Sequence, residues 1–223
     1  MREKLLNIKV NGPHDNAKTV VCESENAQAA MILVHGRGSS AMEMLGLAEL
    51  LRLPKQVMVL AVEANGQQWY PGRFLIPRVE NQPYLDSALE VVGECVRIVE
   101  NEYGLSREKI ILGGFSQGAC LVADYCARHA QKYGGVVVLS GGLIGSMEEV
   151  VVQKWEGDLQ KTSVLVGCDA RDVHIPLQWV EKTIEVMKEL GGVVFGRIYS
   201  GLGHTINQEE LEIIRGMVRE LVK

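Results

Sequence analysis

Residues 110–119 read IILGGFSQGA, a short apolar run followed by a glycine-rich turn around Ser116. In the pattern G-x-S-x-G the positions of Gly114 and Gly118 must be small, because the serine sits in a strained turn between a strand and a helix. With 24 glycines in the chain the pattern alone is weak support, so its context decides. The apolar run predicts a buried strand before Ser116, and the residues after it predict a helix.

The same alternation of strands and helices extends over the chain. Apolar runs predict further strands at residues 29–34, 57–62, 136–139, 164–166 and 193–199. Helical periodicity predicts helices from the Ser40 cap to residue 51, from residue 85 onward, and near 117–130, 178–190 and 207–222. Continuous Val/Ile/Leu runs are typical of a parallel sheet covered on both faces. We therefore expect one α/β domain over residues 1–223, with the more polar segments 5–10 and 19–24 as an edge hairpin.

Composition narrows the partners and the compartment. The 23 Lys and Arg against 28 Asp and Glu give a net charge of −5, so we expect no nucleic-acid partner. Apolar runs such as 57–62 are far shorter than the ~20 residues of a transmembrane helix, and no small-residue cleavage site follows the N-terminus. Five cysteines without a C-x-x-C pair favour a reducing compartment and no metal site. We expect a cytoplasmic protein whose oligomeric state, a homodimer included, is left open.

A serine hydroxyl needs a general base, and the base needs an acid that orients it. In chains with this turn the order is serine, acid, histidine, each on a loop after a strand. His204 follows the strand at 193–199 and is the predicted base. Asp169 and Asp172 both follow the strand at 164–166; we favour Asp172 and expect the other aspartate to form a turn.

The negative charge that develops on a substrate carbonyl oxygen needs two backbone N–H donors. One is expected from Gln117, directly after the serine, and the other from Arg37 in the sequence HGRG at residues 35–38. The flanking glycines would let this backbone approach the substrate.

The remaining histidines are not expected to act in catalysis. His35 is predicted to brace the loop that carries Arg37. His174 is predicted to pack near the acid, although substrate binding is the alternative, and His14 and His129 are expected at the surface.

The long segment 64–83 contains several glycines and prolines and follows a buried strand, so we expect a functional loop. Its aromatic residues are candidates for an acyl pocket, and the alternative is that they only anchor the loop. The candidate substrate-binding residues are Trp69, Tyr70, Phe74 and Leu75, together with Leu143 and Ile144 after another strand. The chain has little room for a large lid, which favours short or medium acyl groups.

Residues 35–38, 114–119, 172–176 and 203–204 together resemble the phospholipase/carboxylesterase group of α/β-hydrolases, which includes the acyl-protein thioesterases. The resemblance covers nearly the whole chain and implies the α/β-hydrolase fold. It implies the triad Ser116, Asp172 and His204, because the family's acid stands four residues before a proline, here Pro176. It also implies Arg37 and Gln117 as oxyanion donors.

The chemistry implied is hydrolysis of a small-molecule carboxylic ester through an acyl-enzyme, with no metal or organic cofactor. Hydrolysis of a (lyso)phospholipid, an acyl thioester or a lactone remains an alternative. A non-catalytic binding module on the same fold is a further alternative from another class.

Overall fold

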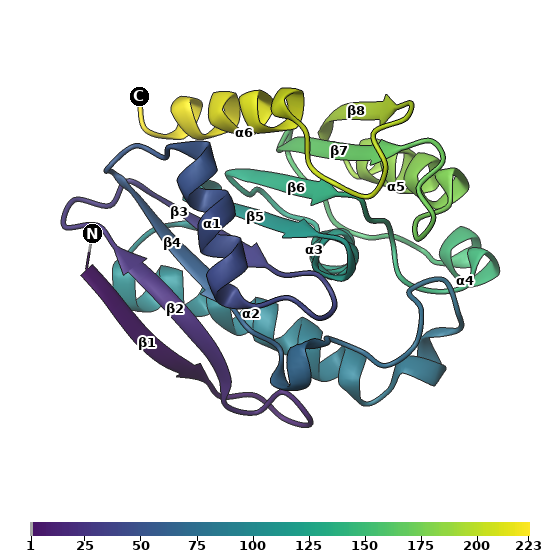
Figure 1. Ribbon diagram of the computed structural model, residues 1–223, viewed down its shortest axis with the longest axis horizontal. Helices are drawn as coiled ribbons and strands as arrows, with labels where there is room; N and C mark the ends of the chain where they lie inside the picture. The colour runs from purple at the N-terminus through teal and green to yellow at the C-terminus, as the bar shows by residue number, and fades with distance from the viewer. Residues whose placement is uncertain (1) are drawn as a thin grey trace.

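The computed structural model describes residues 2–223, and its centre is one eight-stranded sheet (Figure 1). The strand order is β1-β2-β4-β3-β5-β6-β7-β8. β1 and β2 form the predicted edge hairpin, and β2 is also antiparallel to β4, whereas all later neighbours are parallel. The strands are β1 (Arg2–Ile8), β2 (Ala17–Glu23), β3 (Ala29–Val34), β4 (Val57–Val62), β5 (Ile110–Phe115), β6 (Gly135–Leu139), β7 (Ser163–Asp169) and β8 (Val193–Tyr199).

Helices cover both faces of the sheet, as the sequence predicts (Figure 1). α1 (Ala41–Leu51) and α6 (Gln208–Leu221) lie on one face, while α2 (Tyr84–Tyr103), α3 (Gln117–Arg128) and α5 (Leu177–Glu189) lie on the other. Ser40 caps α1 as predicted, because its side chain accepts the N–H of Glu43. A short helix that the sequence does not predict, α4 (Met147–Val152), begins with a capping box between Ser146 and Glu149.

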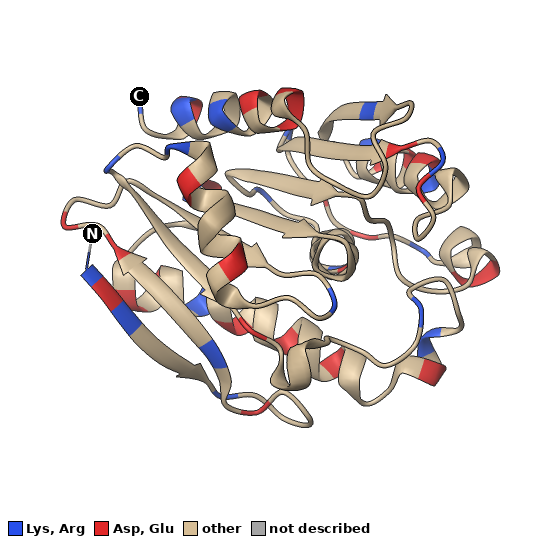
Figure 2. Ribbon diagram, in the orientation of Figure 1, with Lys and Arg blue, Asp and Glu red and all other residues tan. Residues whose placement is uncertain are grey.

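The strands are apolar throughout because the sheet has a core on each side. In β3, residues 30, 32 and 34 pack into the core with α2 and α3, and residues 29, 31 and 33 pack into the core with α1 and α6. Charged residues lie mainly on the helices, the hairpin and the loops, with Asp169 at the end of β7 and Arg197 in the edge strand β8, whereas the strands β3 to β6 carry none (Figure 2). Among the described residues, every helix is too short or too polar to cross a bilayer.

The strands β3 to β8 are parallel, so their carboxyl ends all lie at one edge of the sheet (Figure 1). The loops after β3, β4, β5, β7 and β8 all start at this edge, and they carry the residues that the sequence predicts for the site. Ligands of open α/β sheets bind outside the carboxyl ends of the strands. The fold therefore gathers these loops around one place.

Candidate active site

Ser116 lies in a strained turn between β5 and α3. Its backbone angles, φ 55° and ψ −120°, are in a region that non-glycine residues rarely adopt. A Cβ on Gly114 would lie 2.5 Å from the carbonyl oxygen of Gly118, and one on Gly118 would lie 2.5 Å from that of His35. The Ser116 N–H donates to Leu139 O at 2.9 Å, which ties the turn to β6. Only glycine fits at the two positions that lie two residues before and two residues after this serine.

His204 lies between Ser116 and Asp172. Its Nε2 is 2.9 Å from Ser116 Oγ, and its Nδ1 is 2.6 Å from Asp172 Oδ2. The ring also contacts Phe115, at 4.9 Å between centroids, and His174, at 4.8 Å. The structure thus brings the three residues predicted as a triad into one chain of contacts, from loops after β5, β7 and β8.

The Asp172 carboxylate is buried and fully used as an acceptor. Its Oδ1 accepts the N–H groups of His174 at 2.8 Å and Ile175 at 3.2 Å, while Oδ2 faces His204. Burial by itself raises the pKa of this carboxyl, but the hydrogen bonds from His204 and the two backbone N–H groups outweigh it, so the pKa lies below its usual value. The thiol of Cys168 lies 3.7 Å from Oδ2, and burial beside this carboxylate raises the pKa of that thiol to about 12.

Asp169 has a different position from Asp172. Its Oδ1 accepts the N–H of Arg171 at 2.7 Å, which makes the expected turn. Its Oδ2 also accepts the N–H groups of Leu202 at 2.5 Å and Gly203 at 3.2 Å. The first of these backbone bonds, to Arg171, contributes most to holding the pKa of Asp169 below its usual value. Asp169 therefore fixes the loop that carries His204, a positioning contact that the sequence does not reveal.

The loop after β3 approaches Ser116 closely. A Cβ on Gly36 would lie 3.2 Å from Ser116 Cβ. Within the part of the chain that the structure describes, the backbone N–H groups of Arg37 and Gln117 have no hydrogen-bond partner. The loop and the start of α3 therefore offer two free donors beside the serine, at the positions the sequence predicts.

The buried side chains of His35 and Gln117 hold the backbone around these donors in place. His35 Nε2 accepts the N–H of Ala64 at 2.9 Å and its Nδ1 lies 2.6 Å from Gly36 O, as expected for a brace. Burial lowers the pKa of His35, which keeps the ring neutral. The Gln117 side chain accepts the N–H of Trp69 at 2.9 Å and donates to Tyr70 O at 2.8 Å. The segment after β4 is thereby joined to the start of α3.

The prediction that His14 lies at the surface is wrong. Its side chain is fully buried, with Nε2 2.8 Å from Trp69 O and the ring centroid 5.5 Å from that of Trp69. The indole Nε1 of Trp69 in turn donates to His35 O at 2.9 Å. The connection between β1 and β2 thus supports the loop that brings Arg37 to the site. His129 is exposed, as predicted.

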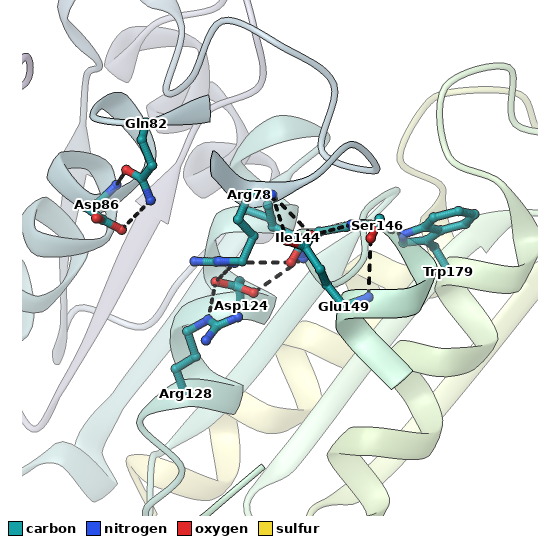
Figure 3. A network of polar contacts seen from close by, with 10 residues as sticks. Arg78, Gln82, Asp86, Asp124, Arg128, Ile144, Ser146, Glu149 and Trp179 are labelled. Carbon is teal, nitrogen blue, oxygen red and sulfur yellow. Dashed lines mark hydrogen bonds and ion pairs between the residues drawn. The ribbon is translucent and has the colours of Figure 1, made fainter. Parts of the chain in front are cut away.

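A polar network anchors the far end of segment 64–83 (Figure 3). Asp124 of α3 is buried and its Oδ2 accepts from Arg78 at 2.8 Å and from Arg128 at 2.9 Å. The Arg78 N–H also donates to Glu149 of α4, at 3.1 Å to Oε2. Figure 3 shows Arg78 between the two acidic residues. The loop is therefore held at both ends, at Trp69 and at Arg78.

Ser116 and His204 open into a cavity of about 640 Å³. This volume falls in the range of about 300–1,000 Å³ that is typical of small-molecule sites. Its apolar wall consists of Tyr70, Phe74, Phe115 and Ile175. His174, for which packing was predicted, is exposed and also lines the cavity. Its charged lining includes Arg37, Glu43 and Arg73.

Two of the six candidate substrate-binding residues, Tyr70 and Phe74, line this cavity. The others point elsewhere, because each satisfies contacts inside the fold. Trp69 is fully buried beneath the loop, and Leu75 packs against the core beneath α2 and α3. Leu143 and Ile144 are fully buried, and the Leu143 N–H donates to Thr183 of α5. The prediction that these four residues line the acyl pocket is therefore wrong, because none of them lines the cavity.

A family model described as phospholipase/carboxylesterase matches residues 15–222. The chain belongs to this family. It is therefore an enzyme of the serine hydrolase class, with ester or thioester hydrolysis as its activity.

The relatives of this phospholipase/carboxylesterase family member include acyl-protein thioesterases and a phospholipase/carboxylesterase. Acyl-protein thioesterase 1 of Kluyveromyces lactis is 29% identical over 88% of this chain and 93% of its own length, and that of Debaryomyces hansenii is 26% identical over 93% and 97%. The crystal structure of a phospholipase/carboxylesterase from Dyadobacter fermentans superposes with a TM-score of 0.83 at 33% identity, covering 90% of this chain and 95% of the other.

Proposed function

We propose that this protein hydrolyses carboxylic esters through an acyl-enzyme on Ser116, with His204 as base and Asp172 as the orienting acid. The observation that carries the proposal is the position of the His204 ring, with Nε2 2.9 Å from Ser116 Oγ and Nδ1 2.6 Å from Asp172 Oδ2. A histidine held in this way can accept the serine proton on Nε2 while the carboxylate stabilises the imidazolium that forms.

The reaction proceeds in two halves. Ser116 Oγ attacks the ester carbonyl carbon and its proton passes to His204 Nε2, while the backbone N–H groups of Arg37 and Gln117 hold the oxyanion. The tetrahedral adduct collapses, the C–O bond to the alcohol breaks, and His204 gives its proton to the leaving oxygen. Water, deprotonated by His204, then attacks the acyl-serine and releases the acid. The chain's own residues carry every proton in this sequence.

Short to medium acyl groups suit this cavity. Its apolar wall includes Tyr70, Phe74, Phe115 and Ile175, and the rest of the lining includes the charged side chains of Arg37, Glu43 and Arg73. The bulky core residues that could extend an apolar tunnel, Leu143 and Ile144, are sealed in the interior. Such a lining favours substrates smaller than a membrane lipid.

Thioester hydrolysis is the second candidate. It is favoured by the acyl-protein thioesterases among the relatives, which align with nearly the whole chain. The same three residues would act, because a thioester carbonyl forms the same oxyanion and a thiolate is the easier leaving group. The choice between the two is a matter of rate and must be measured with matched acyl chains.

The test combines covalent labelling with substrate profiling. Wild type and Ser116→Ala are treated with a fluorophosphonate and analysed by intact mass, and both are assayed with 4-nitrophenyl esters from acetate to palmitate and with thioesters of the same acids. We expect one adduct and ester turnover in the wild type only, with the highest kcat/KM at or below about eight carbons. Labelling or turnover retained by Ser116→Ala would refute the proposal, and a higher kcat/KM for every thioester would select the second candidate.

A further inference from the structure

We infer that the cavity takes substrates that carry a carboxylate, and that the guanidinium of Arg73 binds this group. The inference rests on the proposed function, since it assigns a substrate class to the same cavity. It starts from the charged lining, in which two guanidinium groups and one carboxylate surround Ser116.

The two arginines of the cavity differ in what their N–H groups are doing. Arg37 donates from Nη1 to Gln68 Oε1 at 2.7 Å and Pro71 O at 3.0 Å, and from Nη2 to Tyr70 O at 2.9 Å and Gly72 O at 2.6 Å. Four of its five N–H groups are thereby used by neutral acceptors. Arg37 contributes a positive charge and fixes the loop, but it has little capacity left to bind a ligand.

Arg73 has that capacity. Among the described residues its guanidinium has one acceptor, His174 O at 3.3 Å, and no carboxylate within ion-pair distance. The other N–H groups of its planar fork are free and match the two oxygens of a carboxylate. The contact with His174 O also places the guanidinium beside the residue whose ring packs on His204. A bound carboxylate would therefore lie within reach of the ester that Ser116 attacks.

The backbone that carries Arg73 is rigidly held. Asn81 is fully buried, and its side chain accepts the N–H of Gly72 at 2.8 Å and donates to Arg73 O at 2.9 Å. The next residue, Phe74, is 6% exposed and its backbone oxygen accepts the N–H of Gly145. An exposed side chain on a fixed backbone is well suited to bind a ligand, because the backbone loses little conformational entropy on binding.

The acidic groups around the cavity do not cancel this charge. Asp172 faces His204, as described above. Glu43 belongs to the other wall, on α1, and its Oε2 accepts the hydroxyl of Ser39 at 2.5 Å. Asp172 is not part of the cavity lining, which therefore holds two guanidinium groups, of Arg37 and Arg73, and one carboxylate, of Glu43, so that the lining is positive beside residues 70–74.

The test compares esters that differ by one charge. In the first pair, 4-acetoxybenzoate and 4-acetoxybenzamide, the charge is on the leaving group. In the second pair, mono-4-nitrophenyl adipate and 4-nitrophenyl hexanoate, it is on the acyl group. The ratio of kcat/KM for the charged ester to that for its neutral partner is measured in wild type, Arg73→Gln and Arg171→Gln. Arg171 is a matched control, an exposed arginine outside the cavity lining on the neighbouring loop.

We expect Arg73→Gln to lower this ratio about tenfold in one pair, as loss of a hydrogen-bonded charge partner does. The pair that responds identifies the half of the substrate that carries the carboxylate. Arg171→Gln should keep the wild-type ratio. Unchanged ratios in both pairs, or an equal fall in Arg171→Gln, would overturn the inference while hydrolysis of the neutral esters still supports the proposed function. Hydrolysis of the neutral esters by Ser116→Ala would instead refute the proposed function itself.

Discussion

Replacing Asp172 by asparagine tests the proposed acid through the tautomer of His204. One carboxylate oxygen now accepts from His204 Nδ1, and the other accepts the N–H groups of His174 and Ile175. An asparagine has a single carbonyl oxygen and can serve only one of these two sides. The side it serves decides which nitrogen of His204 carries the proton.

The structure favours the side of the two backbone groups. If the amide turned its NH₂ toward them, both N–H groups would lose their acceptor, at about 1–3 kcal/mol each. That cost of about 2–6 kcal/mol exceeds the roughly 1 kcal/mol of one hydrogen bond to His204. The NH₂ group therefore faces Nδ1, which must then be an acceptor, and the proton moves to Nε2. In this tautomer His204 cannot take the Ser116 proton, and we expect kcat to fall about 10⁴-fold, as it does in other triad hydrolases.

The assay is kcat for a 4-nitrophenyl ester, with the rate of fluorophosphonate labelling as a second readout and circular dichroism to verify the fold. Asp169→Asn is the matched control, because its oxygens accept only backbone N–H groups. We expect this variant to stay within about tenfold of wild type, since it loses part of a positioning contact. Asp172→Asn with near wild-type kcat, or a larger loss in Asp169→Asn, would refute the tautomer argument.

Three further predictions concern stability, all measured by urea unfolding. Gly118→Ala should destabilise the protein by about 3 kcal/mol, because its methyl group would lie 2.5 Å from His35 O. Gly46→Ala is the control: it adds a methyl group in open space within α1 and should stabilise the protein by about 0.5–1 kcal/mol. Equal effects of the two substitutions would contradict the close fit of the turn. Burial raises the pKa of Glu210 from 4.5 to about 7, so the folded state keeps a proton that the unfolded state releases, and stability falls as pH rises from about 4.5 to 7. Glu210→Gln should gain up to about 3 kcal/mol over wild type across this window and no more above it, and a gain independent of pH would exclude this cause. Asp124→Ala should cost about 3 kcal/mol, because both arginines of the network in Figure 3 lose their partner; a loss below about 1 kcal/mol would mean that solvent replaces the carboxylate.

The fold could be predicted because its strands are buried on both sides and therefore read as uninterrupted apolar runs. Element bounds from the sequence lie within a few residues of the observed ones. The helix α4 escaped prediction because its 6 residues are too few to show a helical period. The signal available was the capping box, a serine at 146 followed three residues later by Glu149.

The positions of the candidate site residues could be predicted where they depend only on which strand the residue follows in the sequence. Ser116, Asp172 and His204 come together because parallel strands end at the same edge of the sheet. The direction of a loop side chain follows instead from tertiary contacts that the sequence does not display. Trp69 turns inward because its indole donates to His35 O. The polar residues around His14 in the sequence predict an exposed side chain, and its burial depends on a contact with Trp69, 55 positions away in the sequence. The free guanidinium of Arg73 is likewise visible only once its neighbours are known.

The burial of His14 bears on how this enzyme can be shortened. The family match begins at residue 15, so trimming the protein to that boundary would delete His14 and leave the oxygen of Trp69 without its partner. The truncated protein would also lack β1, the edge strand of the sheet, and we expect slower hydrolysis even where it folds, because Trp69 loses its contact with His14 and supports the Arg37 loop less firmly. The connection between β1 and β2 therefore supports the active-site loop through His14, and a search for a minimal active fragment should start upstream of this residue.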